Sequence, residues 1–200
     1  MSARRIVVAI SGASGSIYAR RLLAVLGGAK TGSLPGVPAM PGLDVHWVAT
    51  TNAELVWQQE LGEPMPSSVP GTRRWAIQDF AAPFASGSNA PDAVIVAPCS
   101  MSTLARVAHG GGGDLISRAC DVALKERRGL VLLARETPLS LVHLRNMVAA
   151  TEAGAIVLPA VPSFYGTITT LEEAIDTVIA RALDRAGLQL PLVRRWGEQP

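Results

Sequence analysis

The feature that most constrains the fold is a regular alternation of short apolar runs with segments of helical periodicity. Ile6–Ile10 is a β-branched run without polar alternation, which is typical of a strand buried on both faces of a parallel sheet. Four further runs have this character: Val45–Val48, Ala93–Ala97, Leu130–Leu133 and Ile156–Leu158. Five segments are predicted to be helices: Ile17–Leu26, Ala53–Glu60, Leu115–Lys125, Leu139–Ala153 and Leu171–Leu183. The alternation predicts an α/β fold with a parallel sheet covered by helices, in which ligands bind at the carboxyl ends of the strands.

Length and composition favour one domain over residues 1–200 that binds a small molecule. A chain of 200 residues that is 48% hydrophobic can bury a sizeable core. The formal charge of +2 is too small and too scattered for a nucleic-acid surface. No apolar stretch reaches the roughly 20 residues that a membrane span requires, and the N-terminus lacks a signal-peptide pattern. We therefore expect a cytoplasmic protein with neither a nucleic-acid partner nor a membrane span.

Three segments rich in glycine or proline predict loops. Gly27–Gly42 carries no periodicity and is interpreted as a surface loop between the first helix and the second strand. Leu61–Gly71 contains three prolines, which exclude a regular helix. Gly110–Gly113 either forms a tight turn or lets a ligand approach the backbone closely.

The loop Ser11–Ser16, which separates the first strand from the first helix, is a candidate anion site. It places backbone N–H groups and hydroxyls at a helix N-terminus, where phosphate binds well. The full G-x-G-x-x-G pattern is absent, and Ala49, Thr50 and Thr51 stand where NAD binding wants an acidic residue. The sequence thus favours a mononucleotide over a dinucleotide. The alternative is that the glycines serve only to turn the chain.

Polar and aromatic residues follow two further strands. Three hydroxyl residues precede a short predicted helix: Ser100, Ser102 and Thr103. They either cap that helix or donate hydrogen bonds to a ligand. Phe164 and Tyr165 lie in the loop after the last strand, where they form a ligand wall or pack on the core. Both loops belong to the edge where a ligand is expected.

The fourth strand is followed by a charged pair and a predicted helix start. Arg135 and Glu136 lie at the strand's end, with Thr137 expected to cap the next helix and Pro138 in its first turn. An ion pair on the surface would explain the charged dipeptide equally well.

The cysteines and histidines predict neither a disulfide nor a metal centre. Cys99 and Cys120 match no disulfide framework or zinc ligand set, and small buried thiols are the simpler interpretation. His46, His109 and His143 have no spacing typical of a metal site or a catalytic triad. We expect no bound metal.

Five stretches resemble the flavin prenyltransferase family, the UbiX proteins, in the family's order and over nearly the whole chain. They are AISGASGSIYARRLL, ASGSNAPDAVIVAPCSMSTLA, ISRACDVALKERRGLVLLARETPLSLVHLRNM, GAIVLPAVPSFYG and RRWGE. The resemblance implies a flavodoxin-like or Rossmann-like fold with helices on both faces of the sheet, and a homododecamer. It also implies a metal-independent transfer of a dimethylallyl group from dimethylallyl phosphate to reduced FMN. The prenylated FMN would then serve a UbiD-type decarboxylase.

The resemblance also assigns residues. Around FMN it places Gly12, Ala13, Ser14, Thr50, Ser100, Met101, Ser102, Thr103, Arg118 and Arg135. At the prenyl phosphate it places Lys125, Arg135, Glu136, Tyr165 and Arg181. Its catalytic set is Ser14, Glu60, Lys125, Glu136 and Trp196. Within that set, Glu60 and Ser14 suit proton transfer and Trp196 would close the site from a tail at about 188–200. Without the resemblance, Lys125 would be interpreted as part of a solvated helix end.

Two departures and two rival functions accompany this resemblance. Thr50 and Thr51 stand where Ser-Lys is usual, and the Gly27–Gly42 loop is long for the family. A related FMN-dependent cysteine decarboxylase would share the fold, but its Pro-Ala-Ser-Ala-Asn-Thr motif and catalytic histidine are not evident. A non-catalytic FMN carrier would have no use for the second phosphate site.

Overall fold

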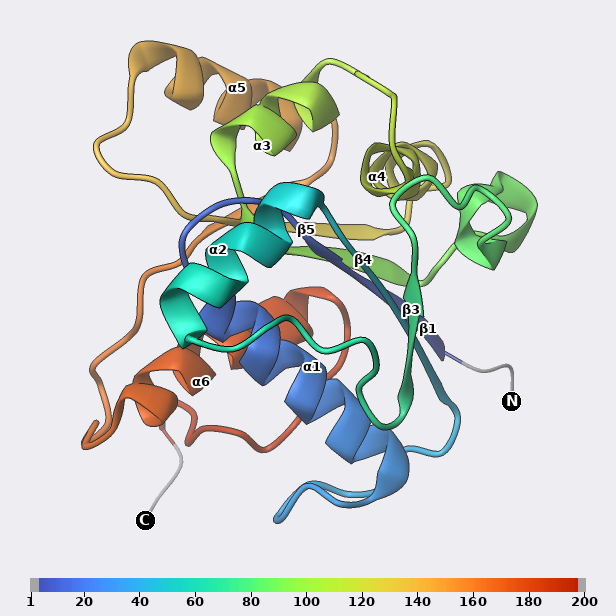
Figure 1. The fold of residues 1–200 in the computed structure, drawn as a ribbon. Helices are drawn as coiled ribbons and strands as arrows, with labels where there is room; N and C mark the ends of the chain where they lie inside the picture. The colour runs from blue at the N-terminus through green and yellow to red at the C-terminus, as the bar shows by residue number, and fades with distance from the viewer. Residues whose placement is uncertain (1–3, 198–200) are drawn as a thin grey trace.

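The computed structural model describes residues 4–197 and contains a six-stranded, wholly parallel sheet with helices on both faces (Figure 1). The strands are β1 Arg4–Ile10, β2 Leu43–Ala49, β3 Thr72–Trp75, β4 Ala93–Cys99, β5 Gly129–Ala134 and β6 Ile156–Pro159. The α-helices are α1 Ser16–Thr31, α2 Thr51–Leu61, α3 Met101–Ala108, α4 Leu115–Lys125, α5 Leu141–Glu152 and α6 Leu171–Arg185. Two short 3-10 helices, η1 Pro83–Ala85 and η2 Gly87–Asn89, precede β4.

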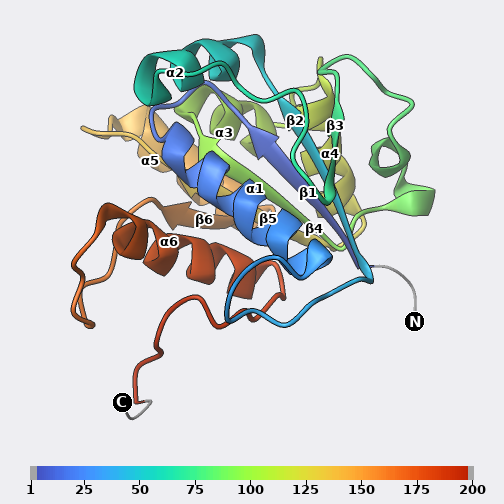
Figure 2. The same ribbon diagram turned by 60° about the horizontal axis from the view of Figure 1, so that its bottom comes forward.

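Two apolar layers hold the sheet. Helices α1, α2 and α6 pack on one face, and α3, α4 and α5 cover the other (Figures 1 and 2). Every residue of β4 is buried, as expected for a central strand with helices on both sides. The predicted flavodoxin-like or Rossmann-like fold class is confirmed.

The strand order β3-β2-β1-β4-β5-β6 places a topological switch between β1 and β4. The chain moves outward from β1 to β2 and β3, and then returns to β1's other side with β4. Loops from neighbouring strands diverge at such a point, so a crevice opens at the carboxyl ends of β1 and β4. The Ser11–Ser16 loop and Ser100 lie at this end of the sheet.

The predicted loop at 27–42 is wrong in its first part, because α1 continues to Thr31. The glycines serve close packing there. A Cβ on Gly27 would lie 2.3 Å from the carbonyl oxygen of Pro70, and one on Gly28 would lie 2.9 Å from Leu34 Cβ. The helix ends at Gly32, whose φ of 74° is the left-handed conformation that glycine favours. The predicted loop at 61–71 is confirmed from Gly62 onward, because α2 continues through Leu61. Gly110–Gly113 joins α3 to α4 with Gly110 in a turn, and the four glycines also line a cavity of about 350 Å³.

Two further predictions differ from the structure. The edge strand β3 was not predicted, because its sequence TRRW has neither an apolar run nor strict alternation. Thr137 does not cap α5. That helix begins at Leu141, because Ser140 accepts a hydrogen bond from the His143 N–H and the His143 side chain accepts one from the Ser140 N–H.

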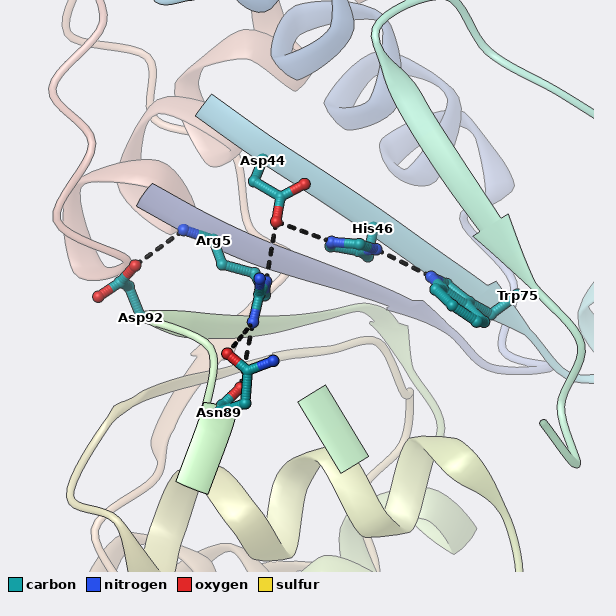
Figure 3. A network of polar contacts seen from close by, with 6 residues as sticks. All are labelled: Arg5, Asp44, His46, Trp75, Asn89 and Asp92. Carbon is teal, nitrogen blue, oxygen red and sulfur yellow. Dashed lines mark hydrogen bonds and ion pairs between the residues drawn. The ribbon is translucent and has the colours of Figure 1, made fainter. Parts of the chain in front are cut away.

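A polar network joins β1, β2 and β3 on the face of the sheet that α4 covers (Figure 3). Arg5 Nε donates to Asp44 Oδ2 at 2.8 Å, and the same oxygen lies 3.0 Å from His46 Nε2. Trp75 Nε1 donates to His46 Nδ1 at 2.8 Å, so Nδ1 is the unprotonated nitrogen. Burial lowers the pKa of His46 below its ordinary value, although hydrogen bonding to Asp44 acts in the opposite direction. The network fixes β3 on the edge of the sheet.

Candidate functional site

Ser11 joins the loops on the two sides of the topological switch. Its buried hydroxyl donates to the Pro98 carbonyl at 2.9 Å and accepts from the Ser100 N–H at 2.8 Å. Thr50 is brought to the same edge by its N–H, which donates to the Ile10 carbonyl at 3.0 Å. The candidate FMN residues that follow β1, β2 and β4 therefore form one contiguous edge.

Glu60 reaches from the end of α2 to the N-terminus of α1. Its carboxylate accepts hydrogen bonds from Gly15 N at 3.0 Å and Ser16 N at 2.7 Å, and it also hydrogen-bonds the Ser14 hydroxyl. Burial raises the pKa of this carboxyl, but the hydrogen bonds outweigh burial and leave the pKa below its ordinary value. Glu60 is therefore an anion at neutral pH, connected to Ser14 as a proton relay requires.

This contact bears on where a phosphate would bind. The N–H groups of Gly15 and Ser16, at the positive end of α1, already donate to the Glu60 carboxylate. A phosphate on the same donors would lie against a carboxylate, and like charges repel. Two of the N–H groups at the α1 terminus therefore hold Glu60, and the expected phosphate position at this loop stays a prediction.

The helices α2 and α3 begin with matching caps at this edge. Thr50 Oγ1 accepts from Ala53 N at 3.0 Å, and Ser100 Oγ accepts from Thr103 N at 3.3 Å. The capping interpretation of Ser100 is therefore confirmed. Thr103 is buried, whereas Ser102 is exposed at the edge.

Arg135 lies over the first loop. Its N–H donates to the Cys99 carbonyl at 3.3 Å, and its Cγ is 3.8 Å from where a Cβ on Gly15 would stand. Burial raises the pKa of nearby Tyr18, and the positive charge of Arg135 only partly offsets that effect. Glu136, the next residue, is exposed and accepts a hydrogen bond from its neighbour's N–H.

A cavity of about 480 Å³ opens beside Thr50, and the sequence did not reveal it. Among its walls are Thr51, Glu54 and Arg74, with Arg74 paired to Glu54 and placed 4.8 Å over the Trp47 ring. Two of these walls come from α2, and the third comes from β3. The cavity was missed because β3 was not predicted.

Three residues assigned by resemblance form a second group, along α6 and the C-terminal tail. Tyr165 and Trp196 meet edge to face with ring centroids 5.1 Å apart, and both are largely exposed. Arg181 Nη1 lies 3.6 Å from Asp184 on the next turn of α6. Leu188 and Leu190 of the tail are buried in the core, and residues 198–200 of the expected tail lie outside the described residues.

The helix α4 carries Arg118 near its start and Lys125 at its end, and Lys125 lies far from Arg135. Arg118 donates to the Ala85 carbonyl, and Lys125 pairs with Glu126 at the helix end. Lys125 precedes β5, whereas Arg135 follows it. The six residues of β5 span about 20 Å, so Lys125 lies near the amino end of this strand and Arg135 at its carboxyl end. One chain does not gather the expected phosphate-binding set.

The cysteines offer no reactive thiol within the described part of the chain. Cys99 and Cys120 are both fully buried. Burial raises the pKa of Cys120 to about 12 and raises the pKa of Cys99 as well. Within residues 4–197 no group of three His, Cys, Asp or Glu side chains is arranged for a metal ion. No helix in the same range is long and apolar enough to cross a bilayer.

Comparisons with known proteins decide the family. A profile described as Flavoprotein matches residues 1–183. The flavin prenyltransferase UbiX of Methanocaldococcus jannaschii is 40% identical over 194 residues, which are 96% of this chain and 98% of that protein. The chain belongs to the flavin prenyltransferase family. The predicted relationship is therefore confirmed.

Two solved structures of similar proteins agree with this assignment. The crystal structure of AnUbiX (PadA1) in complex with FMN and dimethylallyl pyrophosphate has a TM-score of 0.82 and 40% identity, covering 98% of this chain and 99% of its own. A dodecameric FMN-dependent UbiX-like decarboxylase from Escherichia coli O157:H7 also has a TM-score of 0.82, with 36% identity, and covers 97% of this chain and 100% of its own. As a member of the flavin prenyltransferase family, the chain shares its fold with both over nearly its full length.

Proposed function

We propose that the protein transfers a dimethylallyl group from dimethylallyl phosphate to reduced FMN, and that the prenylated FMN is delivered to a UbiD-type decarboxylase. The observation that carries the proposal is the Glu60 carboxylate held against Ser14 beside Arg135, at the switch point of a chain of this family. This arrangement combines a base, a hydroxyl relay and a cation at the edge where the fold binds ligands.

The donors along this edge fit FMN. The Arg135 guanidinium and the hydroxyls of Thr50 and Ser102 suit phosphate and ring carbonyl oxygens. The N-terminus of α3 adds a positive dipole end that is not occupied by Glu60. FMN in its reduced form would supply the nucleophilic atoms that receive the prenyl group.

The chain's own residues have distinct tasks in this proposal. The allylic carbon–oxygen bond breaks, the phosphate leaves with the bonding electrons, and a carbon–nitrogen or carbon–carbon bond forms to the flavin. Ser14 passes the flavin's proton to Glu60, whose lowered pKa keeps it deprotonated at neutral pH. Arg135 and Arg181 counter the charge of the leaving phosphate, as preorganised electrostatic stabilisation requires.

The separation of Lys125 from Arg135 supports a site completed by a second copy of the chain. Lys125 ends α4 at the amino end of β5, on the far side from its own chain's loop edge. The neighbouring α5 exposes a set of large apolar side chains that an assembly would cover: Leu141, Val142, Leu144 and Val148. We propose a homododecamer in which α4 of one protomer faces the flavin edge of another.

Anaerobic incubation tests this function directly. Reduced FMN, dimethylallyl phosphate and protein should yield a flavin heavier by one dimethylallyl group, with a changed absorption spectrum. The yield should be the same with EDTA, because arginine and lysine supply the positive charge. Bound but unaltered FMN would indicate a carrier instead. Oxidative decarboxylation of a peptide with a C-terminal cysteine would indicate the related decarboxylase activity.

A further inference from the structure

We propose that Asp184 is a positioning residue, whose carboxylate holds the C-terminal tail and Arg181 together on α6. The part of this inference that concerns catalysis rests on the proposed function, in which Arg181 binds the prenyl donor's phosphate. The part that concerns the tail stands on the contacts of Asp184 alone.

The Asp184 carboxylate binds two arginines at once. Arg195 of the tail donates from Nη1 to Oδ2 at 2.9 Å and from Nη2 to Oδ1 at 2.7 Å, which is a bidentate pair. Arg181 Nη1, one turn back on α6, lies 3.6 Å from Oδ2. Both oxygens of the carboxylate are thus engaged by the tail, and one of them also faces Arg181.

Burial distinguishes this cluster from an ordinary surface ion pair. The Asp184 side chain is only 5% exposed, so its charge would be costly without cationic partners. The Arg20–Glu63 pair offers the contrast, because its side chains are about half exposed and its atoms are 3.7 Å apart. Such exposed pairs contribute little. The ion pair between Asp184 and Arg195 therefore stabilises the position of the tail against α6.

The same contact determines where Trp196 lies. Trp196 follows Arg195 directly and packs edge to face on Tyr165. The loop that carries Tyr165 is itself fastened to α6, since Ser163 N donates to Thr177 Oγ1 at 3.1 Å. Thr177 and Arg181 are four residues apart and so share one face of the helix. Through these contacts Asp184 holds Arg181, Tyr165 and Trp196 in fixed positions along α6. Figure 2 shows α6 beside the C-terminal tail.

Asp184→Asn tests both parts, with Glu63→Gln as a matched control that removes the exposed ion pair. Trypsin cleavage after Arg194 or Arg195, followed by mass spectrometry, measures how often the tail leaves α6. We expect cleavage about tenfold faster in Asp184→Asn and unchanged in Glu63→Gln. The KM for dimethylallyl phosphate should rise about tenfold, and a larger share of the donor should be hydrolysed, while FMN affinity stays near the parent value.

A second variant guards against a folding defect in α6. Arg195→Gln leaves the helix intact and should accelerate cleavage after Arg194 to the same extent, with no further increase when combined with Asp184→Asn. Unchanged cleavage in both variants would overturn the proposed role in the tail. Faster cleavage with an unchanged KM would overturn the positioning of the donor site. If the parent protein transfers no prenyl group, the proposed function fails, and the cleavage rates still decide whether Asp184 holds the tail.

Discussion

Ser16 and Glu60 belong to different helices, yet the Ser16 N–H donates to Glu60 Oε2 at 2.7 Å and so ties the start of α1 to the end of α2. The contact gives α1 a carboxylate at its positive end, which stabilises the helix and the anion together. It also places that carboxylate on the Ser14 hydroxyl, at the edge where the flavin is proposed to bind.

Replacing Glu60 should separate proton transfer from FMN binding. In Glu60→Gln the amide keeps an oxygen for the N–H groups but loses the base, so we predict a fall in prenyl-transfer rate of about 100-fold or more. FMN affinity should change little. Single-turnover assays and calorimetry measure the two quantities, with Glu63→Gln as the control. A rate near that of the parent would remove Glu60 from the mechanism.

The sequence predicted the parts of the site that follow from strand order. Parallel buried strands bring their carboxyl ends to one edge, and the loops that carry Ser14, Thr50, Ser100 and Arg135 lie at that edge. Helix α4 was predicted with its observed bounds, and the structure shows the Asp114 side chain capping its start.

The parts that sequence did not predict depend on contacts between distant segments. Gly27 was interpreted as the start of a loop, but it lies within α1, where the absence of a side chain lets the Pro70 carbonyl pack closely. No local sequence pattern indicates such a contact. The strand β3 is charged because it lies on the edge of the sheet, where one side faces solvent. Lys125 was grouped with Arg135 by resemblance alone, although the predicted strand Leu130–Leu133 already lies between them in the sequence.

FMN should bind more tightly than NAD. Thr50 and Thr51 follow β2, so this position offers no carboxylate to bind the ribose hydroxyls of a dinucleotide. The Glu60 carboxylate accepts the Ser16 N–H at the α1 N-terminus, where a pyrophosphate would otherwise bind. Ser14→Ala should slow prenyl transfer, because the relay to Glu60 is lost. Isothermal calorimetry with both ligands decides the first point. NAD affinity equal to that of FMN would contradict it.

His46 should make the fold less stable as the pH falls. Burial lowers the pKa of His46 in the folded state below the value of about 6.5 expected when unfolded. The unfolded chain therefore takes up the proton first, and the contribution of neutral His46 is present above pH 6.5 and lost as the pH falls through the folded value. Asp44, whose pKa is lowered from 3.8, acts in a more acidic range.

The variant His46→Gln isolates this effect. Its side chain can donate to Asp44 and accept from Trp75 without taking up a proton. Urea unfolding at pH 7.5, 6.5 and 5.5 should show a smaller loss of unfolding free energy in the variant than in the parent. Equal losses in the two proteins would show that His46 is not the titrating group.

Mixed assemblies test whether Lys125 acts on another protomer's flavin. Lys125→Ala and Glu60→Gln should each be nearly inactive alone. Co-expressed in one assembly, they should recover activity, because some interfaces then combine an intact Lys125 with an intact Glu60. A mixture of separately assembled variants is the control. No recovery in co-expressed protein would place Lys125 outside the site or within its own chain's site.

Removal of the tail from Arg194 onward should impair chemistry without unfolding the protein. Leu188 and Leu190, which are buried in the core, remain in the truncated chain, so the melting temperature should fall only slightly. The truncated chain lacks Trp196 and its edge-to-face contact with Tyr165, so an allylic cation formed beside this loop would meet water more often. Truncation should therefore lower the yield of prenylated FMN and raise hydrolysis of dimethylallyl phosphate to the alcohol. Product analysis measures the ratio directly, because both products derive from the same donor. A truncated protein with the parent's ratio and rate would show that the tail does not shield the reaction.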